Sequence, residues 1–366
     1  GGHCQRVPVL TKLLAQKACD SVEEPFAGFD LSDEQWEEIH IASWLHDCGK
    51  VTTPEYVVDK ATKLETIYDR IHEVRMRFEV LKRDAHVTYW ERVAGGGDRA
   101  QLWTQLEAEW TVLDEEFAFV AGCNLGGEFM AEDKVERLQE IASRSWQRTI
   151  DDRLGLSWEE VQRKERLPIK ELPVTEQLLA DRNDHLFTRS EKYQLQKEND
   201  YGFVLDVPEY LYNRGELYNL SVARGTLTDE ERYQINDHIV QTIIMLKQLP
   251  FPGHLVEVPD IAGGHHEKID GTGYPRRLVG EQMSLPSKMM VIADIFEALT
   301  ASDRPYKKAK KLSDAVKIMG FMEKDNHIDS NLFKLFLTSG AYLEYAREYL
   351  LPDQVDEVDI SQYLKG

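Results

Sequence analysis

Apolar side chains recur at helical spacing along most of this chain. In residues 6–18 the apolar positions lie three and four residues apart, and residues 289–296 form an almost wholly apolar run. Ser32 to Gln35 and Thr228 to Glu231 have the pattern of capping boxes, which begin helices. Almost no segment alternates apolar and polar residues in the manner of a strand. The pattern therefore predicts an all-α fold.

Two segments on either side of Gly95, Gly96 and Gly97 have a narrower apolar stripe. Their apolar residues follow alternating steps of three and four, which is typical of a helix–helix seam. They are Ile67, Ile71, Val74, Phe78 and Leu81, then Trp103, Leu106, Trp110, Leu113, Phe117 and Val120. An intramolecular hairpin and a homodimer explain this coiled-coil-like pattern equally well. A further helix is predicted over residues 132–150.

Charge excludes one class of function. The chain has 366 residues and a formal net charge of −21, whereas proteins that bind DNA or RNA generally need a basic surface. Between Lys268 and Lys311, however, nine Lys and Arg face five Asp and Glu. A small anion could bind there while the rest of the surface repels polyanions. No apolar run approaches the 18 residues or so of a membrane span.

The four cysteines are scattered and form no CxxC motif. This usage indicates a reducing, cytoplasmic location rather than a disulfide framework or a thiolate zinc site. The chain begins Gly-Gly without Met, so we expect that an upstream sensor or anchor could precede it.

Residues 265–275, with the sequence HHEKIDGTGYP, carry the strongest chemical signal. Two adjacent imidazoles, His265 and His266, can both bind metal if the backbone aims them into one site. The carboxylates, glycines and Tyr-Pro that follow indicate a tight polar loop. His46-Asp47 is a second candidate, since a carboxylate beside an imidazole can bridge two ions. Asp294 is a third, because burying a lone carboxylate within an apolar run is costly unless it is paired or binds metal.

These residues resemble the signature of the HD-GYP domain, which occurs in metal-dependent phosphodiesterases that cleave cyclic dinucleotides. The resemblance covers roughly residues 1–83 and 222–345, which would form one discontinuous catalytic domain, an HD-type helical bundle extended by the GYP helices. Residues 84–221 would be a mostly helical insertion, and residues 346–366 a C-terminal tail.

The resemblance implies a full ligand set for two divalent ions of iron, manganese, nickel or zinc. The implied ligands are His3, His46, Asp47, His238, His265, His266 and Asp294. His238 is preferred to His72 because it lies on an apolar helical face at nearly the family's spacing before His265, and His72 remains the alternative. The family's ligand for a third ion would precede Gly1, so a third metal is not supported.

The same resemblance implies residues that contact the substrate. Lys50, Arg304 and Lys307 would contact phosphate, with Lys50 also stabilising charge in the reaction, and the loop residues would be Gly273, Tyr274 and Pro275. The chain departs from the family at Glu297, where aspartate is common. The longer carboxylate is expected to alter a substrate or metal contact.

The resemblance implies hydrolysis of cyclic di-GMP to linear pGpG, and on to GMP in some relatives. Asp47 would bridge the two metal ions, and a hydroxide held between the ions would attack the phosphate. Mixed cyclic GMP-AMP is an alternative substrate. A non-catalytic cyclic-dinucleotide receptor or partner-binding module is a second hypothesis, but degenerate members lose the His-Asp or His-His pair and this chain keeps both. A mononucleotide-cleaving HD enzyme is a third, which the string at 265–275 disfavours.

Overall fold

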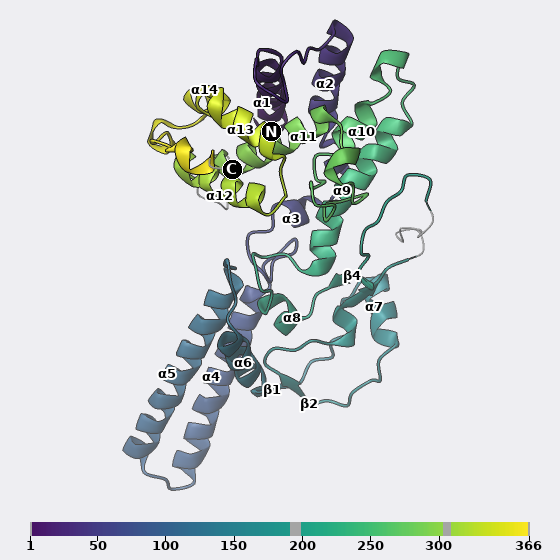
Figure 1. Ribbon diagram of the computed structural model, residues 1–366. Helices are drawn as coiled ribbons and strands as arrows, with labels where there is room; N and C mark the ends of the chain where they lie inside the picture. The colour runs from purple at the N-terminus through teal and green to yellow at the C-terminus, as the bar shows by residue number, and fades with distance from the viewer. Residues whose placement is uncertain (1, 191–198, 303–308, 365–366) are drawn as a thin grey trace. The chain divides into compact units, whose positions relative to one another are not determined.

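Helices dominate the computed structural model, which describes residues 2–190, 199–302 and 309–364 (Figure 1). The predicted all-α class is confirmed. The chain divides into two compact units: unit 1 comprises Gly1–Thr53, Leu195–Asp206 and Gln234–Gly366, and unit 2 comprises Pro54–Gln194 and Val207–Tyr233. Among the described residues, no helix has both the length and the apolar character needed to cross a bilayer. The division into catalytic domain and insertion at residues 84 and 221 remains a prediction.

Unit 1 is a bundle built around α1 (Gly2–Cys19) and α11 (Leu285–Thr300), which pack against each other over much of their lengths. Around this pair lie α2 (Asp33–Leu45), α10 (Val258–Gly263), α12 (Leu312–Lys324), α13 (Ser330–Thr338) and α14 (Ala341–Tyr349), while α9 spans Asp229–Lys247. Their apolar faces form one core that includes Leu10, Met290, Phe296 and Phe336. Both predicted capping boxes are present, at Ser32 and at Thr228.

Unit 2 contains the long hairpin of α4 (Ile71–Ala94) and α5 (Arg99–Asn124), which pack side by side (Figure 1). Most of the apolar seam predicted for these segments packs within the hairpin, through residues such as Val74, Phe78 and Leu113, whereas Ile67 precedes α4 and is exposed. The shorter helices of this unit are α3 (Glu55–Val58), α6 (Glu132–Ala142), α7 (Trp158–Glu165) and α8 (Glu216–Leu220).

The helix predicted over residues 132–150 is too long. The observed α6 ends at Ala142, and the chain continues as strand β1 (Ser145–Arg148), antiparallel to β2 (Val174–Gln177). Alternate residues of β1 are exposed and half-buried, so its pairing with a distant segment overrides the local helical pattern. A second two-stranded ribbon joins β3 (Leu186–Thr188) to β4 (Tyr210–Asn213).

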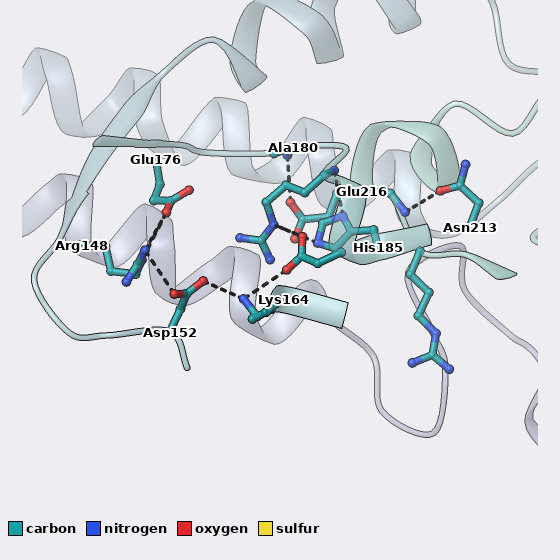
Figure 2. Close-up of polar contacts among 12 residues, drawn as sticks. Arg148, Asp152, Lys164, Glu176, Ala180, His185, Asn213 and Glu216 are labelled. Atoms are coloured by element: carbon teal, nitrogen blue, oxygen red, sulfur yellow. Dashed lines mark hydrogen bonds and ion pairs between the residues drawn. The ribbon is translucent and has the colours of Figure 1, made fainter. Parts of the chain in front are cut away.

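Buried charges in unit 2 are paired with one another (Figure 2). Lys164 Nζ lies 2.6 Å from Asp152 and 3.1 Å from Asp184, and Arg148 Nη2 lies 3.1 Å from Glu176. The Glu216 carboxylate accepts hydrogen bonds from both terminal nitrogens of Arg77 and from the Ala180 amide. These ion pairs connect the β1–β2 ribbon, α4, α7 and α8.

Candidate metal centre

The turn after α2 brings His46 and Asp47 against α9. A Cβ on Gly49 would lie 2.0 Å from the carbonyl oxygen of His238, so only glycine permits this approach. The Gly49 amide donates to Thr242 Oγ1 at 2.9 Å, and the same hydroxyl donates to the His46 carbonyl at 3.2 Å. Thr242 therefore fixes the turn, although no motif in the sequence singled it out.

Seven side chains predicted as metal ligands come together in unit 1. Three overlapping sets each place one ligand atom per residue within 4.8 Å of the others: His238, His265 and His266; His3, His46 and Asp294; and His46, Asp47 and His265. His46, Asp47, His238 and His265 are buried. The cluster draws its residues from α1, the turn after α2, α9, the segment after α10, and α11.

Three of the histidines are held in one tautomer by their own backbone. Nδ1 of His46 donates to the Ser43 carbonyl, and Nδ1 of His265 donates to the Ala262 carbonyl, each at 2.6 Å. Nδ1 of His238 donates in the same way to Ile235. Because a neutral imidazole carries one proton, Nε2 of each ring presents a lone pair to the cluster. Histidines that bind metal are usually oriented in this way, by a hydrogen bond from the other ring nitrogen to an oxygen atom.

The imidazole nitrogens and carboxylate oxygens of the cluster lie close to one another. Nε2 of His238 lies 3.3 Å from Nε2 of His266 and 3.3 Å from Asp47 Oδ1. Although these distances are short, Nε2 of His46, Nε2 of His265 and Asp47 Oδ1 are buried and accept no hydrogen bond from the described residues. Buried acceptors without a donor are costly, and a cation among them would remove that cost. The mixed imidazole and carboxylate donors thus fit a divalent transition metal.

Electrostatics in the cluster favour positive charge. Burial alone raises the pKa of a carboxyl, yet neighbouring imidazoles hold the pKa values of Asp47 and Asp294 well below their usual range. Burial also opposes protonation of His3, but hydrogen bonds with Asp294, Asp47 and Glu297 outweigh it and raise the pKa of His3 to about 11. In contrast, burial lowers the pKa of His266 to about 3, so this ring is neutral and can bind metal.

His3 lies in the first turn of α1, and the packing of α1 against α11 brings it to the cluster. Its Nε2 is 3.1 Å from Asp294 Oδ1, and its Nδ1 contacts Glu297. Glu297 lies three residues after Asp294, on the same face of α11. Arg6 Nε donates to the other Glu297 oxygen at 2.7 Å. Glu297 therefore orients His3, a contact that the sequence did not reveal.

The loop that contains Gly273, Tyr274 and Pro275, here called the GYP loop, is held by the buried carboxylate of Glu267. This carboxylate accepts hydrogen bonds from the backbone amides of Arg276 at 2.7 Å and Leu278 at 2.9 Å. A Cβ on Gly273 would lie 2.4 Å from the Glu267 backbone, so glycine is required there as well. The Tyr274 ring stacks on His266, with centroids 4.8 Å apart. The loop is thus packed directly against a predicted ligand.

A short segment, Tyr201–Asp206, which we call the strap, also holds this loop. The Val204 amide donates to the Pro275 carbonyl at 2.6 Å, and Asp206 pairs with Arg277 at 2.9 Å. Phe203 is buried against Val240 and Ile243 of α9. The strap falls within residues 84–221, which the sequence assigned to the insertion, and its backbone contacts left no signal in the sequence.

The remaining predicted residues have different positions. Lys50 Nζ lies 2.5 Å from Asp47 Oδ2 with its side chain 41% exposed, so it can reach a bound anion. His72 lies in unit 2, where its Nδ1 is 2.7 Å from Arg75 Nη1. Arg304 and Lys307 fall outside the described residues. The geometry therefore favours His238 over His72 as the fifth histidine of the cluster.

Comparison with known proteins identifies a similar domain in the part of the chain that contains most residues of the cluster. Residues 173–332 match the family model of the HD domain. This segment of the chain is therefore similar to the HD domain. The matched residues include His238, His265, His266 and Asp294, whereas His46 and Asp47 precede them.

Several curated proteins are similar to shorter segments of this chain. A 113-residue segment, 31% of this chain, is 39% identical to a cyclic di-GMP phosphodiesterase of Pseudomonas aeruginosa and covers 26% of that protein. A 113-residue match at 38% identity links 31% of the chain to 25% of 3′3′-cGAMP-specific phosphodiesterase 1 of Vibrio cholerae. A cyclic di-GMP phosphodiesterase of Thermotoga maritima is 35% identical over 92 residues, 25% of this chain and 24% of its own length. The chain thus matches about a quarter of each relative, and these matches confirm the resemblance to the HD-GYP phosphodiesterases.

Proposed function

We propose that this chain is a metal-dependent phosphodiesterase that hydrolyses a cyclic dinucleotide, with cyclic di-GMP as the first candidate and linear pGpG as the first product. The observation that supports it most is the group of buried imidazole and carboxylate lone pairs that no described donor satisfies. Relatives named for cyclic di-GMP and for 3′3′-cGAMP match at 39% and 38% identity, so mixed cyclic GMP-AMP is a second candidate.

The residues of the cluster fit two divalent ions. His238, His265 and His266 would hold one, and His3, His46 and Asp294 the other, with Asp47 between the two sets. When bound, such ions lower the pKa of water and offset the charge of a phosphate. Iron, manganese, nickel and zinc all suit these donors. The four free cysteines accord with a cytoplasmic location for this activity.

The protein's own groups would bind and orient the substrate. Lys50, held beside Asp47 and partly exposed, would stabilise negative charge on the scissile phosphate. The loop of Gly273, Tyr274 and Pro275 would place the dinucleotide against the cluster, since Tyr274 already stacks on His266. In-line attack by water at phosphorus then breaks the bond to the ribose 3′-oxygen, which takes up a proton as it leaves. The reaction needs no covalent protein nucleophile.

The decisive experiment follows products and metal together. Purified protein is incubated separately with cyclic di-GMP and mixed cyclic GMP-AMP, products are separated by chromatography, and bound metal is measured by elemental analysis. We expect linear dinucleotide from at least one substrate and about two ions per chain by the family resemblance. Asp47→Ala should lower activity at least about 100-fold and reduce bound metal.

The matched control is His72→Ala, which removes an exposed histidine of unit 2. It should leave turnover and metal content unchanged. Binding of either dinucleotide without any turnover by the metal-loaded protein would instead identify a receptor. Wild-type activity in Asp47→Ala would show that the site is misassigned.

A further inference from the structure

Helix α4 has an apolar stripe outside the core of its hairpin, where the Arg99 guanidinium at the start of α5 lies 5.4 Å from the centroid of the Trp90 ring. Towards α5 it presents Val74, Phe78, Leu81 and Ala85, which pack in the hairpin core. A second stripe consists of Met76, Val80, Val87 and Trp90, at spacings of four, seven and three residues. At 3.6 residues per turn, this stripe lies about 180° around the helix from the first.

The second stripe is largely open to solvent. The exposed fractions of Met76, Val87 and Trp90 are 62%, 56% and 46%, and Val80 is half-buried. The outer face of a helix in a two-helix hairpin is normally polar, so an apolar row of about four turns there indicates a second contact.

The outer face of α5 provides an internal comparison. The residues opposite its seam are Thr104, Ala108, Thr111 and Glu115, all exposed and either small or polar. Val112 lies at the edge of that face. The outer face of α4 is therefore more apolar than the outer face of α5, although both helices belong to the same hairpin.

The sequence of α4 is complementary to itself when reversed. A two-fold axis between Arg83 and Asp84 would place Val80 opposite Val87 of the partner subunit, with Met76 near Trp90 of the partner subunit. The same axis would set Arg83 against Asp84 of the partner subunit and, reciprocally, Asp84 against Arg83 of the partner subunit. An isologous interface requires this reciprocity.

Charge also favours this face for self-association. A chain of net charge −21 repels a second copy over most of its surface. The charged residues of α4 nearly cancel: they are Arg75, Arg77, Lys82, Arg83 and Arg92 against Glu73, Glu79, Asp84 and Glu91. α5 has one arginine and five acidic residues. Two copies therefore meet with least repulsion through α4.

We propose that the protein forms a homodimer in which the α4 helices of two copies pack antiparallel along this second stripe, with reciprocal Arg83–Asp84 ion pairs at the centre. This dimer is independent of the proposed catalytic activity, because all its contacts lie in unit 2.

The test measures mass by sedimentation velocity on the full chain at about 1 to 100 µM, the range in which small interfaces associate. The wild type should approach twice 42.3 kDa as concentration rises. Val87→Asp should remain a monomer. Arg83→Asp and Asp84→Arg, each made alone, place like charges opposite each other and should raise the dissociation constant about tenfold or more.

The double variant Arg83→Asp/Asp84→Arg restores opposite charges across the axis and should return the dissociation constant to near the wild-type value. Glu115→Arg on the outer face of α5 is the control and should not weaken the dimer. Thermal melts followed by circular dichroism check that each variant is folded. If Val87→Asp does not fold, the variants of the exposed residues Arg83 and Asp84 still test the proposal. A wild type that stays monomeric would overturn the proposal, and so would a double variant as weak as the single ones.

Discussion

Two buried clusters of polar side chains in this protein are built on opposite principles. In unit 2, Glu216 faces Arg77, and Lys164 faces Asp152 and Asp184, so opposite charges pair within the protein. In unit 1, imidazole nitrogens lie beside one another and beside a carboxylate oxygen, and several of these atoms accept no hydrogen bond from the described residues. Burying charged and polar groups costs free energy in both clusters. In unit 2 the opposite charges reduce that cost by pairing with each other, whereas in unit 1 a bound cation would be needed to reduce it. The difference distinguishes charges that stabilise a fold from donors arranged for a ligand.

We expect the largest effect, a loss of stability, in the ion-paired cluster of unit 2. Glu216→Gln should lower the free energy of unfolding by about 3 kcal/mol, because it leaves the Arg77 guanidinium without its buried carboxylate. Urea denaturation measures the loss, and the metal content of the folded protein should not change. The control is Glu73→Gln, which removes a partner 3.7 Å from Arg77 that is 54% exposed. It should cost under about 1 kcal/mol.

The second effect concerns the unpaired cluster. His238→Ala should reduce bound metal and lower activity by about 100-fold, with little loss of stability in the metal-free chain, because the polar neighbours of His238 Nε2 are other residues of the cluster, His266 and Asp47. Elemental analysis and product formation are the measurements. If His72→Ala lost metal and His238→Ala did not, the ligand assignment would have to be reversed.

A smaller effect is expected where the strap meets the GYP loop. Val204→Pro removes the amide that donates to Pro275 and should raise KM about fivefold, the equivalent of roughly 1 kcal/mol, with less change in kcat. Val204→Ala keeps the amide and should have near wild-type kinetics. Equal losses in the two variants would point to side-chain packing rather than to loop position.

The smallest effect is the pH dependence of the Glu216 ion pair. Burial alone raises the pKa of this carboxyl, but Arg77 outweighs it and holds the pKa below its usual value of about 4.5. Because the ionised form is favoured in the folded protein, the stabilisation is complete above the unfolded-state pKa and is lost as pH falls through the folded-state pKa. The stability difference between wild type and Glu216→Gln, measured in urea, should be constant near neutral pH and shrink below about pH 4.5. A difference unchanged in acid would rule out this linkage.

Local patterns were sufficient for most helices and for the hairpin seam, because helix caps and three-to-four spacing are encoded within a few residues. They failed after Ala142, where β1 depends on pairing with residues 174–177. They also missed Thr242 and Val204, whose contacts join a hydroxyl or a backbone amide to residues far away in the chain. Such contacts have no periodicity to detect.

The sequence by itself determined which side chains are available as metal ligands: the adjacent His265 and His266, the His46-Asp47 pair, and Asp294 in an apolar run. Only the tertiary structure decided that their free lone pairs converge, that His238 rather than His72 lies beside them, and that the Tyr201–Asp206 strap lies against the GYP loop. The physical reason is distance along the chain. Residue type and spacing fix which atoms can donate, whereas convergence of atoms from residues 3 to 294 depends on how α1, α9 and α11 pack.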